Sequence, residues 1–147
     1  QAALTLVKAS ATRLGLVSRM FEIHDVHLHV PAGAIQKDGP SAGVAMFVAL
    51  ASLFGDNNVR PDVAMTGEIS LRGLVLPVGG IKEKVLAAER AGIKTVMLPS
   101  RNRKDLVDIP SSTQNAMRFV WLDNVNQALD VALNGRAKHR VEEFHLV

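Results

Sequence analysis

The chain has 147 residues, which is enough for one domain and too few for two of ordinary size. Hydrophobic residues make up 48% and charged residues 21%, a balance that fits a folded globular domain and argues against disorder. Cysteine is absent, which excludes disulfides and cysteine-ligated zinc and makes a reducing compartment the simplest expectation.

The net charge is +3, but the basic residues are scattered along the sequence. The densest cluster, Arg101, Arg103 and Lys104, is interrupted and is followed by two aspartates. We interpret it as a solvated helix start rather than a nucleic-acid patch, because a single tryptophan and no tyrosine offer no platform for stacking bases. No uninterrupted apolar run reaches about 18 residues, so no membrane-spanning helix is predicted.

Helices and strands alternate along the predicted secondary structure. Apolar residues at helical spacing predict helices over 1–14, 40–54, 80–91, 101–107 and 124–133. Alternating or short apolar runs predict strands over 24–30, 62–69, 74–78, 94–98 and 117–122. The strands at 62–69 and 74–78 are predicted to form a hairpin. Glycines are expected to end four of the helices, at Gly15, Gly55, Gly92 and Gly135, and Asn124 is expected to cap the last one.

This order of elements predicts one α/β or α+β domain with small mixed sheets and flanking helices. Because Gln1 already lies in a predicted helix, we expect the chain to begin inside a folded unit and to be part of a longer protein. The segment from Arg136 to Val147 is mixed in charge and is expected to be a loose tail.

The segment Lys37–Gly43 (KDGPSAG) is the most informative stretch for function. Proline is favoured as the first residue of a helix, so Pro40 places Ser41 near the second helical position. There the free N–H groups and the positive end of the helix dipole can hold an oxyanion, and Gly39 and the small neighbours admit a peptide backbone. The alternative is that Ser41 only caps the helix, although Asp38 or Gly39 is the better cap.

The residues 39–43 also satisfy the G-x-S-x-G pattern of the α/β-hydrolase nucleophile elbow. An elbow follows directly on a strand, whereas a loop of roughly eight residues intervenes here. The only histidines left for a triad would be His139 and His145, in the expected tail. The pattern therefore does not support that reading.

A serine nucleophile needs a base, and the predicted helix at 81–91 offers two lysines. At 100° per residue, Lys84 falls beside Ile81 and Ala88 on a mostly apolar arc, whereas Lys82 falls on the charged side. A lysine packed among apolar side chains loses hydration, which favours the neutral amine that can accept a proton. The alternative is that Lys84 covers apolar surface with its methylene groups and extends its ammonium into water.

Three blocks together, Lys37–Gly43, Met65–Ile69 and Leu76–Lys84, resemble the proteolytic domain of the Lon proteases. The resemblance runs from residue 1 to at least Pro110. It implies that the serine of D-G-P-S-A-G, Ser41, is the nucleophile of a serine endopeptidase. It also implies that the second lysine of G-G-x-K-E-K, Lys84, is the general base.

The same resemblance assigns supporting roles around this dyad. The hydroxyl of Thr66 is expected to support the lysine amine, and Glu68 to line the site. Asp38 is expected to modulate the lysine or the serine loop, with Gly39 and Pro40 completing it. Gln36 departs from the proline common in the family at that position, without touching a catalytic role.

For the whole protein, the resemblance implies an upstream ATPase module that binds ATP and Mg, since no Walker A motif occurs here. It implies a homohexameric ring that degrades unfolded, damaged or regulatory proteins. The D-G-P form resembles the bacterial and organellar branch, which implies a bacterial cytoplasmic location before a mitochondrial one. The first strands of the family's domain are expected to be missing from this chain.

Three other functions are weighed against this one. Gly39–Gly43 could cradle a phosphate, as in small-molecule kinases of the same broad superfamily. A non-catalytic scaffold would not need both Ser41 and Lys84. A zinc site could use residues near 24–29, namely His24, Asp25, His27 and His29, but no third ligand on the strand face of His27 and His29 is evident.

Overall fold

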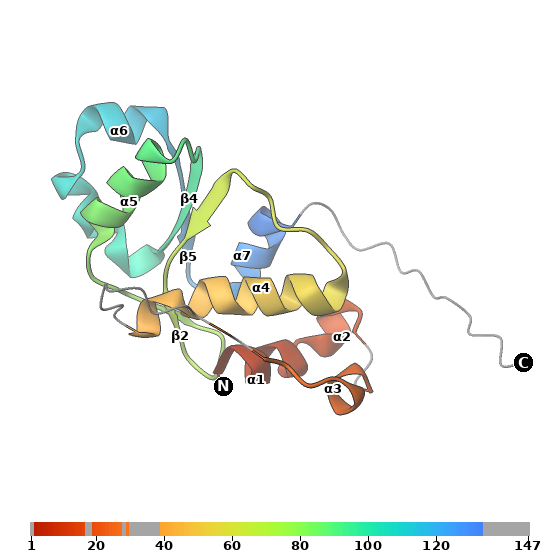
Figure 1. Ribbon diagram of the computed structural model, residues 1–147. Helices are drawn as coiled ribbons and strands as arrows, with labels where there is room; N and C mark the ends of the chain where they lie inside the picture. Colours follow the sequence, from red (N-terminus) through yellow and green to blue (C-terminus); the bar gives the residue numbers. More distant parts are fainter. Residues whose placement is uncertain (1, 17–18, 28, 30–38, 134–147) are drawn as a thin grey trace, which may run out of the picture.

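The computed structural model describes residues 2–16, 19–27, 29 and 39–133, and the whole chain is drawn in Figure 1. The strands are β1 (Val63–Met65), β2 (Glu68–Ile69), β3 (Val75–Leu76), β4 (Thr95–Pro99) and β5 (Arg118–Leu122). The α-helices are α1 (Ala2–Ala9), α2 (Ala11–Leu14), α3 (Met20–Ile23), α4 (Gly43–Gly55), α5 (Ile81–Arg90), α6 (Ser111–Ala116) and α7 (Val125–Ala132). Two 3₁₀ helices are η1 (Gly39–Ala42) and η2 (Ser100–Asp108). This mixture confirms the predicted α/β class.

The strands form two small sheets. A parallel sheet has the order β1-β4-β5, with Met97 of β4 paired to Met65 on one side and to Val120 on the other. The second sheet is the antiparallel pair β2–β3, in which Glu68 faces Leu76. Every residue of the central strand β4 is buried, as expected for a strand covered on both faces.

Two hydrophobic clusters lie on the two faces of this parallel sheet. The first contains Met97 and the buried side of α4, which packs between α1 and α7. The second contains Val96 and Leu98 together with the buried side of α5. Successive side chains of a strand point to opposite faces, so β4 contributes to both clusters. Figure 1 shows the same division, with α5 and α6 on one side of β4 and α4 and α7 on the other.

Most predicted elements are confirmed near their expected bounds. The helix α5 ends before Gly92, whose φ of 76° lies in the left-handed region that glycine tolerates. The Asn124 side chain accepts a hydrogen bond from the N–H of Asn126, and Gln127 completes a capping box at the start of α7. The predicted stop at Gly135 and the tail at 136–147 lie outside the described residues. The described part of the chain contains no helix long and apolar enough to cross a membrane.

Several helices differ from the prediction. The first helix is divided at Ser10, which separates α1 from α2. The stretch at 101–107 is a 3₁₀ helix, and the short helices α3 and α6 were not predicted. The helix predicted over 40–54 was expected to stop at Gly55, but Gly55 is still helical. The residue that follows the helix is Asp56, whose φ of 46° lies in the left-handed region.

The strand predicted at 24–30 is wrong for the residues that can be tested. Residues 24–27 and 29 have no regular secondary structure, while Leu28 and Val30 lie outside the described residues. Among the described residues of this segment, Val26 is partly buried whereas His27 and His29 are exposed, and Leu28 and Val30 leave the rest of the alternation untested. A strand also needs a neighbour to receive its backbone hydrogen bonds, and these described residues pair with none of the described strands.

The strand predicted at 62–69 is two strands in two different sheets. The chain leaves β1 at Thr66 and Gly67 and enters β2 at Glu68. The predicted hairpin is therefore confirmed only for β2 and β3, whose turn is closed by the Ser70 N–H donating to the Leu74 carbonyl over 3.0 Å.

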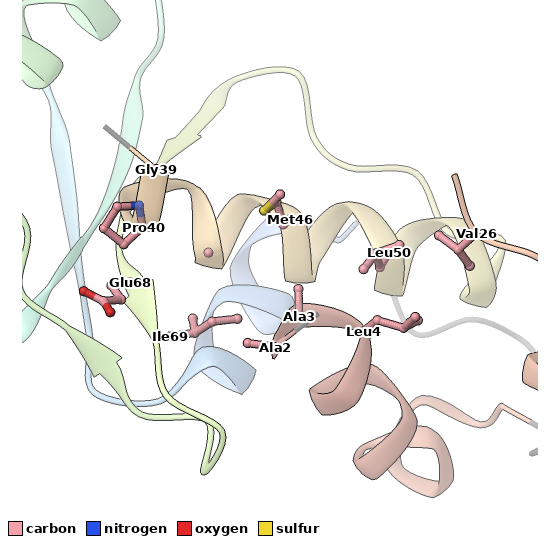
Figure 2. A pocket seen from close by; sticks show the side chains of 11 residues that line it. Ala2, Ala3, Leu4, Val26, Gly39, Pro40, Met46, Leu50, Glu68 and Ile69 are labelled. Carbon is pink, nitrogen blue, oxygen red and sulfur yellow. The ribbon is translucent and has the colours of Figure 1, made fainter. Parts of the chain in front are cut away.

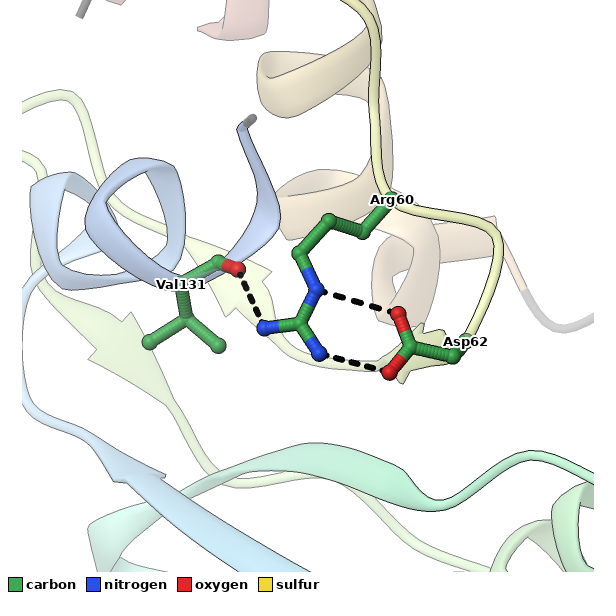
Figure 3. A network of polar contacts seen from close by, with 3 residues as sticks. All are labelled: Arg60, Asp62 and Val131. Atoms are coloured by element: carbon green, nitrogen blue, oxygen red, sulfur yellow. Dashed lines mark hydrogen bonds and ion pairs between the residues drawn. The ribbon is translucent and has the colours of Figure 1, made fainter. Parts of the chain in front are cut away.

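A polar clamp ties the end of α7 to the entrance of β1. The Arg60 guanidinium donates two hydrogen bonds to the Asp62 carboxylate, of 3.0 and 2.6 Å, and a third of 3.4 Å to the Val131 carbonyl (Figure 3). The Arg60 N–H also donates to the Ala132 carbonyl over 2.8 Å. The side-chain hydrogen bond from Arg60 is the main cause that lowers the pKa of Asp62 from its ordinary value of 3.8.

We predict that this clamp loses its contribution to stability in acid. A lowered carboxyl pKa stabilises the fold above the unfolded pKa of about 3.9, and this stabilisation disappears as pH falls through the folded pKa. The difference in free energy of unfolding between the wild type and Asp62→Asn should be constant near neutral pH and shrink below about pH 4. Urea unfolding followed by Trp121 fluorescence measures it. An unchanged difference at about pH 3 would contradict the prediction.

Candidate active site

Ser41 lies in the 3₁₀ turn η1, and its main-chain carbonyl is held by the connection between β1 and β2. The oxygen accepts hydrogen bonds from the Gly67 N–H (3.0 Å) and from the Thr66 hydroxyl (3.2 Å). In return, the N–H of Val44 donates to the Gly67 carbonyl over 3.0 Å. We call this set of three hydrogen bonds the Ser41–Gly67 clamp. It fixes the main chain of the serine turn against the sheets.

The clamp explains a difference from the sequence prediction, which placed Ser41 at the second position of a helix that starts at Pro40. The α-helix starts at Gly43, with Ala42 as the N-cap, so Ser41 precedes it. The Ser41 carbonyl is directed towards Thr66 and Gly67, and this favours the tighter 3₁₀ turn. One of the expected oxyanion donors, the N–H of Val44, is used inside the clamp.

Two glycines allow the close approach that the clamp requires. A Cβ atom on Gly43 would lie 3.0 Å from the Ile69 main-chain nitrogen and 3.2 Å from the Gly67 carbonyl oxygen. A Cβ atom on Gly67 would lie 2.8 Å from side-chain carbons of both Val44 and Val75. Neither position has room for a larger residue, so both glycines are explained by packing.

Lys84 lies on α5, whose buried residues Ile81, Val85 and Ala88 belong to the second hydrophobic cluster. Lys84 is partly buried whereas Lys82 is exposed, which confirms the helical-wheel prediction that separated them. The Lys84 amine donates a 3.0 Å hydrogen bond to the Gly79 carbonyl at the start of its own helix. Its pairing with Ser41 stays a prediction.

Thr66 is only 7% exposed and immediately follows β1, where its N–H donates to the Met97 carbonyl over 3.1 Å. Its hydroxyl donates to the Ser41 carbonyl, so Thr66 supports the serine turn directly. The role predicted for it was support of the lysine amine. A hydroxyl that donates one hydrogen bond keeps its lone pairs, so that role stays a prediction.

An apolar groove of about 440 Å³ runs beside η1 between α1, α4 and β2. Figure 2 shows Glu68 and Pro40 at one end and Leu4, Leu50 and Val26 towards the other. The groove is lined by Ala2, Ala3, Leu4, Val26, Gly39, Pro40, Gly43, Met46, Leu50, Glu68 and Ile69. Three predicted site residues, Gly39, Pro40 and Glu68, therefore meet at one surface, whereas Asp38 lies outside the described residues.

Met46 and Leu50 were not predicted to line a groove. The side chains of Val44, Phe47, Val48 and Ala51 are all buried and form a core face of α4. Met46 and Leu50 are four residues apart on a neighbouring stripe of the same helix. This second apolar stripe was the sequence signal for the groove, because a helix that packs against the core on one side alone needs only one apolar stripe.

The alternative sites receive no support from the part of the chain that the structure describes. No three His, Cys, Asp or Glu side chains come together there to hold a metal. The rings of His27 and His29 are stacked 6.5 Å apart, without an acidic partner among those residues. The N–H of Val44, the residue after the segment 39–43 considered as a phosphate cradle, donates to the Gly67 carbonyl.

The basic cluster in η2 is also partly engaged within the fold. The Arg103 guanidinium lies 5.1 Å from the centre of the Trp121 ring, a cation–π contact. Trp121 in turn stacks with Phe119 of the same strand.

Comparison with known proteins shows the family. The family model described as "Lon protease (S16) C-terminal proteolytic domain" matches residues 1–135. A Lon protease of Paraburkholderia phytofirmans is 64% identical over 129 residues, and one of Methylocella silvestris is 59% identical over 137. These alignments cover 88% and 93% of this chain. A Lon protease of Syntrophus aciditrophicus is 59% identical over 90% of the chain.

Together with the fold and the geometry of the serine turn, the family match identifies the chain as a proteolytic domain. The chain belongs to the family of Lon protease C-terminal proteolytic domains. It spans 16–17% of the length of these three curated relatives.

We predict that Gly43→Ala displaces the serine turn. The added methyl group has no room against Ile69 and Gly67, so the cost is about 1–3 kcal/mol of unfolding free energy. Thermal or urea unfolding measures this cost. Gly55→Ala is the matched control on the same helix, because a Cβ there meets nothing within 4 Å. It should be neutral or stabilising by up to about 1 kcal/mol. Equal effects of the two substitutions would contradict the packing explanation.

Proposed function

We propose that this chain is the serine peptidase domain of a Lon-type protease, with Ser41 as nucleophile and Lys84 as general base. The observation that carries the proposal is the position of η1, where the Ser41–Gly67 clamp fixes the serine turn beside an apolar groove. The family match over residues 1–135 supports it independently of that geometry.

The proposed reaction begins when the neutral Lys84 amine accepts the proton of the Ser41 hydroxyl. The hydroxyl oxygen then attacks the substrate carbonyl carbon, forming a tetrahedral intermediate whose oxyanion is held by N–H donors of the serine turn. Lys84 returns the proton to the leaving amine as the peptide C–N bond breaks. A water molecule, deprotonated by the same amine, hydrolyses the resulting ester and releases Ser41.

This mechanism requires the Lys84 side chain to leave its bond to Gly79. The Lys84 amine is part of a side chain with four rotatable bonds, and the Gly79 carbonyl that it contacts lies at the exposed start of α5. Exchanging this exposed hydrogen bond for one to a serine is a small energetic change, on the order of 1 kcal/mol. Substrate binding beside η1 can therefore supply it.

For the whole protein we propose the features expected of a Lon protease. ATP and Mg would bind an ATPase module outside this chain, and six subunits would form a ring. The substrates would be unfolded, damaged or regulatory proteins, and the location a bacterial cytoplasm. The three relatives named above are Lon proteases of bacteria, and their names and organisms support these proposals.

We predict that Ser41→Ala and Lys84→Ala, made in the full-length protein, each reduce cleavage of an unfolded protein by at least about 100-fold in the presence of ATP. The serine variant lacks the attacking oxygen and the lysine variant lacks the base. Hydrolysis of ATP should persist in both, which shows that the protein is folded and assembled. Release of labelled peptides and of phosphate measures the two activities.

Lys82→Ala is the matched control, because it removes a lysine of the same helix that is exposed instead of partly buried. It should retain most of the proteolysis. A peptide boronate should also block the wild type by adding to the Ser41 oxygen, and should not bind Ser41→Ala. Normal proteolysis by Lys84→Ala would remove Lys84 from the mechanism, and normal proteolysis by Ser41→Ala would overturn the proposed function.

A further inference from the structure

The apolar groove has one ionisable residue among the described side chains that line it. Glu68 is this residue, and its neighbours in the lining are aliphatic side chains, methionine, proline and glycine. Figure 2 shows its carboxylate at the end of the groove occupied by Pro40, the residue before Ser41. The charge therefore lies at the Pro40 end of the groove, whereas Leu50 and Val26 lie farther along it.

The main chain holds Glu68 firmly at this place. Glu68 follows Gly67 of the Ser41–Gly67 clamp and pairs with Leu76 in the β2–β3 hairpin. Within the described part of the chain, however, its carboxylate makes no salt bridge and no side-chain hydrogen bond. Among the described residues, Glu68 thus supplies a positioned carboxylate whose lone pairs are available to water or a ligand.

A carboxylate beside an apolar surface responds to what fills the groove. When an apolar side chain occupies the groove, it displaces water and lowers the effective dielectric around Glu68. A cation or N–H donor of the ligand then compensates the carboxylate, whereas a second carboxylate is repelled. Specificity arises from this repulsion as much as from the attraction.

We propose that Glu68 is a specificity-determining residue that selects the charge of the peptide substrate next to the scissile bond. This inference rests on the proposed peptidase function of Ser41. The groove takes an apolar side chain of the substrate, and Glu68 favours a lysine or arginine over a glutamate or aspartate at the neighbouring position. Glu68 takes no part in bond breaking.

The test compares three peptides that share one apolar side chain and differ only at its neighbour, which is Lys, Gln or Glu. Cleavage by the full-length protein with ATP gives kcat/KM for each peptide. For a partly exposed charge pair about 5 Å apart, we expect the wild type to prefer the Lys peptide over the Glu peptide by about 5- to 50-fold. The preference should weaken at high salt, since screening reduces it.

Glu68→Gln should bring the ratio of the Lys and Glu peptides to within about 2-fold, because the amide keeps the size and loses the charge. Glu68→Asp should keep a preference of the wild-type sign. Asp130→Asn is the matched control: it removes a carboxylate from α7 that does not line the groove, and should keep the wild-type ratio.

The outcomes separate this inference from the proposed function. If Ser41→Ala still cleaves the peptides, the proposed function fails. If Ser41→Ala is inactive but Glu68→Gln keeps the wild-type ratio, the inference fails while the proposed function stands. A wild type that shows no charge preference also overturns the inference. An equal decrease in kcat/KM for all three peptides in Glu68→Gln would also overturn the inference, because it would indicate a structural role for Glu68.

Discussion

The carbonyl oxygen of Ser41 is the point on which the arrangement of the site depends. It accepts hydrogen bonds from Thr66 and Gly67, and the Thr66 N–H is itself bonded to Met97 of the buried central strand. A continuous path of hydrogen bonds therefore connects the serine turn to the middle of the fold. Because Gly43 and Gly67 have no side chains, the serine turn and the strands approach closely enough to make it. Local sequence preference alone would have placed Ser41 in a regular helix.

The two halves of the proposed dyad are anchored in different hydrophobic clusters. The serine turn leads into α4, which packs in the first cluster, whereas the buried face of α5, which carries Lys84, packs in the second. The strand β4 supplies Met97 to one cluster and Leu98 to the other, so its packing sets the separation of the two anchors. A change in this core would alter the distance between base and nucleophile without touching either residue.

Sequence patterns predicted the elements whose signals are local. The cap at Asn124, the left-handed stop at Gly92 and the partial burial of Lys84 follow from neighbouring residues. The predictions were wrong where contacts between residues far apart in the sequence determine the structure. The alternation at 24–30 predicts a strand, but a strand also needs a partner, which a single segment does not encode. The run at 62–69 is continuous in hydrophobicity, yet bonds from Thr66 and Gly67 to Ser41 divide it between two sheets.

The second apolar stripe of α4 was the only sequence signal for the groove, which is formed by α1, η1, α4 and β2, elements that meet only in three dimensions. Its geometry has a consequence for the proposed chemistry. Glu68 is the residue after Gly67, so the same clamp that positions the proposed nucleophile also positions the proposed selecting charge. While the clamp is intact, the proposed nucleophile and the proposed selecting charge move together, whereas Lys84 depends on α5 and its separate cluster. The proposed base is therefore the part of the site whose position the clamp does not fix.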